Sequence, residues 1–130
     1  MLKSILSLTM IIGLTACAQS VHQIKNNEPV VTTSIKGNLD VISSCIANGI
    51  EEREGSPLFG YPNVPVRVNS KTNYDVITKD ASTGITFYVV NLDKRNSTVH
   101  ANVSRMNGKA LFGNESFNTD LTKMIEKCSS

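Results

Sequence analysis

Two stretches of the chain carry apolar residues at the spacing of one helix face. In the first stretch these residues are Leu39, Ile42, Ile46 and Ile50, with Cys45 on the same side. In the second stretch they are Phe117, Leu121, Ile125 and Cys128. Such spacing is typical of helices that bury one side, so it predicts a helix over residues 39–53 and a second one towards the carboxy terminus. The candidate capping residues are Asn38 or Asp40 for the first helix and Asn114 or Ser116 for the second.

Three runs between these helices have the composition of strands. They cover residues 74–79, 85–92 and 97–106, and polar turns separate them. In the third run Val99, Ala101 and Val103 alternate with polar residues, which predicts one buried face and one polar face. The middle run is apolar on both sides, as a central strand is. Because short turns join antiparallel neighbours, the three runs predict a meander. Residues 110–112 either add a short fourth strand to it or cover the edge of the core.

The predicted fold class is therefore α+β: a small antiparallel β-meander of three to four strands with two helices on one face, in the order α-β-β-β-α. Both helices need an apolar surface, and the third run offers one on a single side. The length of 130 residues favours one domain, which we place at residues 38–130. Gly49 inside the first helix costs about 1 kcal/mol relative to Ala, so either that helix ends early or another group packs closely there.

The first 16 residues have the three parts of a secretory signal. Lys3 and the free amino terminus supply positive charge, residues 5–14 are apolar, and small residues follow. A membrane-spanning helix needs about 20 apolar residues, and this run is too short. We expect residues 1–16 to be a signal peptide that is removed.

Leu14-Thr15-Ala16-Cys17 resembles the bacterial lipobox. The resemblance implies cleavage before Cys17 by the lipoprotein signal peptidase, and lipid on Cys17 that holds the protein to a membrane. Two or three acyl chains give nearly permanent attachment. Position 18 is Ala and not Asp, so in a bacterium of the enteric type the resemblance implies sorting to the outer membrane and not retention in the inner one. The order of elements also resembles that of short bacterial envelope lipoproteins, a resemblance that implies no particular activity.

Residues 17–37 are predicted to form the lipidated amino terminus and a flexible tether. Most of them are polar, and about twenty flexible residues reach roughly 25 Å, enough to lift a domain off the lipid surface. The alternative is that residues 29–35 form an edge strand of the domain, where Pro29 is tolerated.

Cys45 and Cys128 are the two cysteines that remain when Cys17 carries lipid. Both lie on apolar helix faces, and exported proteins meet an oxidising compartment, so we expect a Cys45–Cys128 disulfide. The alternatives are two free buried thiols or a zinc site that uses both cysteines and a histidine. The closely spaced ligand pairs of zinc sites are missing, so we expect no metal.

A loop over residues 55–65 holds three prolines and two glycines, which exclude regular structure for most of it. It also holds Leu58, Phe59 and Tyr61. These side chains either fold back onto the core or contact a partner. Because aromatic residues in a Pro-rich loop lose little entropy on binding, Leu58, Phe59 and Tyr61 are the candidate partner contact.

Candidate catalytic residues are few. His100 lies on the polar face of its predicted strand, near Ser97 and Ser104, but no Gly-x-Ser-x-Gly turn, phosphate loop or His-Glu-x-x-His motif accompanies it. Glu51, Glu52 and Glu54 indicate a solvated helix end in preference to a cation site. We therefore assign no catalytic residue and expect no cofactor.

The charge pattern bears on partners. Without Lys3 the mature chain carries a net charge of about +1, and no basic patch with interleaved aromatic residues is present, which argues against nucleic acid. We expect a lipid-anchored envelope protein that binds or assists another envelope component without catalysis. The alternatives are a minor envelope hydrolase that uses His100 and a passive structural lipoprotein.

Overall fold

A five-stranded antiparallel sheet lies at the centre of the structure, a computed structural model that describes residues 20–54, 63–106 and 114–129. The strands are β1 (Val31–Lys36), β2 (Asn63–Asn69), β3 (Asn73–Asp80), β4 (Thr86–Arg95) and β5 (Thr98–Arg105). The helices are α1 (Val21–Asn26), α2 (Leu39–Glu54) and α3 (Asn114–Glu126). The fold class is α+β, as predicted.

The strand order is β1-β5-β4-β3-β2, which makes β4 the central strand and leaves β1 and β2 at the two edges. β2 to β5 follow one another as a meander, whereas β1 comes from the amino-terminal part of the chain and pairs with β5. The β1–β5 register runs from Val31 opposite Val103 to Lys36 opposite Thr98. The run that is apolar on both sides is β4, because a central strand is covered on both faces.

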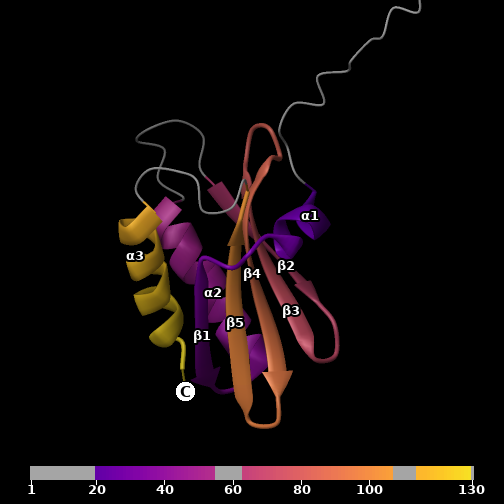
Figure 1. The fold of residues 1–130 in the computed structure, drawn as a ribbon, viewed down its shortest axis with the longest axis vertical. Coiled ribbons are helices and arrows are strands. Elements are labelled where there is room, and N and C mark those ends of the chain that lie inside the picture. The colour runs from indigo at the N-terminus through magenta and orange to yellow at the C-terminus, as the bar shows by residue number, and fades with distance from the viewer. Residues whose placement is uncertain (1–19, 55–62, 107–113, 130) are drawn as a thin grey trace, which may run out of the picture.

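α2 and α3 both pack against one face of the sheet, called the inner face (Figure 1). Asn38 caps α2, since its Oδ1 accepts hydrogen bonds from the backbone N–H groups of Asp40 at 2.8 Å and Val41 at 3.3 Å. The helix residues buried here are Ile42, Ile46, Ile50, Leu121 and Ile125. They meet the strand residues Val76, Val90, Leu92, Val99, Ala101 and Val103. The apolar stripes read from the sequence thus form the main core.

The opposite face of the sheet, called the outer face, is covered in part by α1 (Figure 1). Successive side chains of a strand point to opposite faces, so Ile77 and Val89 point away from the main core. Ile24 of α1 packs on them and is fully buried. A capping box fixes the start of this short helix, with Ser20 and Gln23 each accepting from the other's backbone N–H.

The predicted element count was wrong, because the described residues form five strands and three helices, not three to four strands and two helices. α1 also lies on the face that the prediction left uncovered. Residues 31–36 are an edge strand, the alternative to a tether, because Val31 and Ile35 fill the inner core while Thr32 and Ser34 face solvent. The few apolar residues of this mostly polar stretch, Val31 and Ile35, therefore form the buried face of a strand.

β2 is the other element missing from the prediction. Its first three residues, Asn63, Val64 and Pro65, belong to the segment expected to be an irregular loop. Pro65 fits because β2 is an edge strand, where a missing N–H can face outwards. The expected contact residues Leu58, Phe59 and Tyr61, the lipidation residue Cys17 and residues 110–112 all lie outside the described residues.

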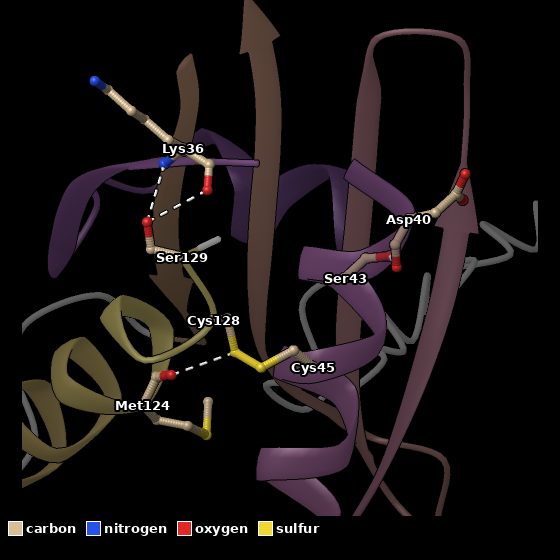
Figure 2. The surroundings of a disulfide bond; sticks show 7 residues. All are labelled: Lys36, Asp40, Ser43, Cys45, Met124, Cys128 and Ser129. Carbon is tan, nitrogen blue, oxygen red and sulfur yellow. Dashed lines mark hydrogen bonds between the residues drawn. A yellow bond between two sulfur atoms is a disulfide. The ribbon is translucent and has the colours of Figure 1, made fainter. Parts of the chain in front are cut away.

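Cys45 of α2 and Cys128, just past the end of α3, form a disulfide, the pairing predicted from the sequence (Figure 2). Ser129 then ties the end of the chain to β1, because its hydroxyl donates to the Lys36 carbonyl oxygen at 3.3 Å. Gly49 has a packing reason as well: a Cβ there would lie 2.7 Å from Sδ of Met124. Close approach of a group to Gly49, one of the two expectations for this position, is what the structure contains.

Candidate functional site

The open edge formed by β2 carries three exposed valines. Val64, Val66 and Val68, here called the valine edge, expose 39%, 40% and 52% of their surface. They alternate with Pro65 and Arg67, so all three side chains lie on the outer face. Large apolar side chains grouped on one surface are more informative than isolated ones, because nothing in the fold requires them there.

The position of the valine edge is fixed by its neighbours on β3. Val64 lies opposite Lys79, Val66 opposite Ile77 and Val68 opposite Asp75. Ile77 is itself buried under α1. Val66 therefore continues an apolar row across the outer face, and this row ends uncovered at the edge of the sheet.

Arg67 fixes the strand from its other side. Its Nη1 donates to the hydroxyl oxygen of Ser44 at 2.7 Å and to that of Ser43 at 3.4 Å, both on α2. Since Arg67 is held against the inner-face helix, the valines on either side of it must point to the outer face. Two features thus place the valine side chains on the outer face: the register of β2 with β3, and the hydrogen bonds of Arg67 to α2.

The backbone of β2 has an open side. The N–H of Ser70 donates to the Asn73 carbonyl oxygen, which shows that the even-numbered positions bond towards β3. Odd-numbered Arg67 and Asn69 consequently aim their backbone groups away from β3. Within the described part of the chain no strand pairs with this side, so it can accept a further strand.

Apart from the valine edge and the apolar cluster under α1, the outer face is polar. Rows of side chains cross the strands and bond to one another, as in Thr32 to Asn102 at 3.1 Å and Asn91 to Asp75 at 2.7 Å. Lys25 of α1 adds an ion pair with Asp75 at 2.9 Å. Mutual hydrogen bonding of this kind is typical of the solvated face of an antiparallel sheet.

His100 stands in one of these rows. The hydroxyl of Ser34 on β1 lies 3.0 Å from its Nδ1, and Asp93 lies opposite it on β4. Of the two serines considered from the sequence, Ser97 is exposed in the turn, whereas Ser104 is buried and donates to the Asn27 carbonyl oxygen at 3.4 Å. Ser34 was not among the expected neighbours of His100, because residues 17–37 were expected to be a tether and an edge strand over residues 29–35 was only the alternative. The alternation of Thr32 and Ser34 with Val31 and Ile35 was the available signal.

A groove of about 750 Å³ runs between α2 and α3 beside the disulfide. Met124 and Gly49 line its floor, and its charged residues are Glu52, Arg53, Asp120, Lys123 and Lys127. Both signs of charge are interleaved, so the groove offers no single ligand chemistry. Glu51 and Glu52 are exposed, and no group of three or more metal-ligating side chains occurs among the described residues.

No helix in the described ranges is long and apolar enough to cross a membrane. Comparison with protein-family models finds no match to this chain, and a search of curated proteins finds no significant similarity.

Proposed function

We propose that the protein is a lipid-anchored component of a bacterial envelope that acts by binding another envelope component, and that the valine edge is its contact surface. The observation that carries this proposal is an open strand edge with three exposed valines on one face. Valine suits a strand, but an exposed apolar edge favours aggregation unless a partner covers it. A bound partner would cover these valines.

Strand addition is the mode of binding that suits this edge. An extended segment of a partner would bond to the outward backbone groups of Arg67 and Asn69, and its alternate side chains would cover the valines. Completing the burial of one half-exposed valine contributes about 0.5–1 kcal/mol. Such an interface is modest, but confinement to the same membrane raises the effective concentration of both partners.

The anchor is the second part of the proposal. Cys17 is the acylated amino terminus, and Ala18 directs the mature protein to the outer membrane. Blocking the lipoprotein signal peptidase should leave a precursor heavier by residues 1–16, and the mature protein should carry acyl mass on Cys17. A mature chain that starts elsewhere or carries no lipid would rule the anchor out.

Photocrosslinking in intact cells tests the contact surface. A photoreactive amino acid at Val66 should give a crosslinked product with an envelope protein, whereas the same residue at Val41, an exposed valine on α2, should not. Val66→Lys should abolish the cellular effect of the protein and leave its thermal stability close to wild type. Equal products at both positions, or an unaltered phenotype of Val66→Lys, would favour the passive structural alternative.

A minor hydrolase is the second candidate, favoured by one observation. The Ser34 hydroxyl lies 3.0 Å from Nδ1 of His100, and Asp93, whose carboxylate accepts a hydrogen bond from Arg95, is the register partner of His100 on β4. A hydroxyl beside an imidazole is the pairing of nucleophile and base. The arrangement lies on an open sheet face. Ser34→Ala and His100→Ala should both abolish the cellular effect if this candidate holds, and both should be silent if the protein only binds.

A further inference from the structure

β2 reads almost the same in both directions. Its sequence is Asn-Val-Pro-Val-Arg-Val-Asn, with Val66 at the centre. An isologous dimer needs a surface that is complementary to itself, and a strand that is symmetric about its central residue meets this condition. We infer that, when no partner strand is bound, two copies of the protein pair through β2 in antiparallel orientation.

The register of this pairing follows from the symmetry. With the two-fold axis at Val66, the two copies of Val66 face each other, and each Val64 faces Val68 of the second copy. The valine edges of the two copies then join in one apolar stripe across the junction. Any other register would leave a valine without an apolar neighbour, so the inference commits to this one.

The backbone of β2 suits the same register. The backbone N–H and C=O groups of the odd-numbered residues point away from β3, so those of Arg67 and Asn69 supply hydrogen bonds between the two copies. The two Val66 residues then form a non-hydrogen-bonded pair, with Cα atoms about 4.5 Å apart. Pro65 lacks an N–H, so each copy contributes one bond fewer than a full ladder would. The pairing is consequently weaker than between strands without proline, and a partner strand can displace it.

The rest of the fold leaves room for the second copy. α2 packs over β2 and β3, so the two copies of α2 would stand about two strand spacings, or roughly 10 Å, apart. This is close to the distance of about 8–10 Å that separates the axes of packed helices, so the two copies of α2 would lie side by side in contact. On the outer face each row would run from Lys79 through Val64 to Val68 and Asp75 of the second copy, so no like charges would meet across the junction.

Pairs of cysteine substitutions test the register in the full-length protein, purified and returned to lipid vesicles so that no partner strand is present. Val66→Cys should yield a disulfide-linked dimer on a non-reducing gel, because paired Cα atoms at this distance suit a disulfide. Val64→Cys or Val68→Cys alone should give little dimer, and the two expressed together should give the mixed dimer. Val41→Cys, on an exposed valine away from β2, is the matched control and should remain monomeric.

Two results would overturn the inference. One is the absence of a dimer from Val66→Cys, and the other is a dimer from Val64→Cys alone that matches the mixed one, which indicates random collision. This inference shares its surface with the proposed function, yet the two fail separately. Capture of another envelope protein from Val66 in cells, with no dimer of the purified Val66→Cys protein, would refute the inference and leave the function standing. A dimer without another captured protein would do the reverse, and no product of either kind would refute both.

Discussion

At the scale of single residues, Asp80 organises the turn between β3 and β4. Its Oδ1 accepts hydrogen bonds from the Ser82 hydroxyl at 2.6 Å and from the backbone N–H groups of Ser82 and Thr83, both at 2.8 Å. Gly84, whose φ is +72°, completes the turn in a conformation that suits glycine. The Ser82 hydroxyl, followed by the Thr83 N–H, lowers the pKa of Asp80 from 3.8 to about 2.

This lowered pKa predicts how stability depends on pH. A carboxyl group with a lower pKa in the folded state adds stability that is complete above the unfolded pKa and is lost as the pH falls from about 4 to about 2. Asp80→Asn should therefore be less stable than wild type at pH 6, and the difference should disappear near pH 2. Thermal melts across this range measure it. Ser82→Ala should lose part of the same difference, and a gap between wild type and Asp80→Asn that does not change with pH would contradict the prediction.

Gly49 gives a second prediction, because replacing it by Ala has two opposing effects on stability. Ala is favoured over Gly in a helix by about 1 kcal/mol, but a Cβ at this position would press on Met124. Gly49→Ala should therefore fail to stabilise the wild-type protein and should stabilise the Met124→Ala variant by about 0.5–1 kcal/mol. Urea unfolding of the four proteins in this double-mutant cycle gives the coupling between the two positions. A coupling near zero would mean that Met124 moves aside freely.

At the scale of elements, β1 is where the structure differs most clearly from the sequence-based expectation, because residues 31–36 form a strand and not a flexible tether. Ile35 is buried in the core, whereas Thr32 on the same strand is exposed. Ile35→Ala should lower the free energy of unfolding by about 2–5 kcal/mol, and Thr32→Ala should change it by only about 0.5 kcal/mol. Chemical denaturation of both variants tests this. In a flexible tether both substitutions would be silent, and that outcome would remove β1 from the domain.

The elements that were predictable are those with a long pattern. α2 repeats Ile42, Ile46 and Ile50 over several turns, and β5 alternates over a whole strand, so a period is visible without knowledge of the fold. The elements that were missed are short or interrupted. α1 buries little besides Ile24, and its clearest signal was the Ser20 and Gln23 capping box.

The candidate site was missed for a related reason. In β2 the alternation of Val64, Val66 and Val68 is complete, but Pro65 sits within it and turn-forming residues precede it, so local composition argued against a strand. What permits the proline is the place of β2 at the edge of the sheet. Edge position depends on how all the strands pair, and a local pattern does not contain that information.

At the scale of the whole molecule, the Cys45–Cys128 disulfide joins α2 to the end of the chain across 83 residues. In the chain-entropy model a loop of this length contributes at most about 4.5 kcal/mol. Cys45→Ala and Cys128→Ala should each lower the free energy of unfolding by up to this amount. The double variant should be at least as stable as the less stable of the two single variants. Urea unfolding without reductant measures the loss. Variants as stable as wild type would show that the bond is dispensable.

The pairing of β1 with β5 has a consequence for the order in which the protein folds. Ser34 and His100, neighbours across these strands, are 66 residues apart in the chain. Contacts this distant must close a long loop before they contribute any stability, which slows folding. Because a chain is made from its amino terminus, β1 emerges early and has no strand to pair with until β5 follows. The sheet is therefore completed late, and a chain stalled before β5 would leave the apolar side of β1 open to aggregation.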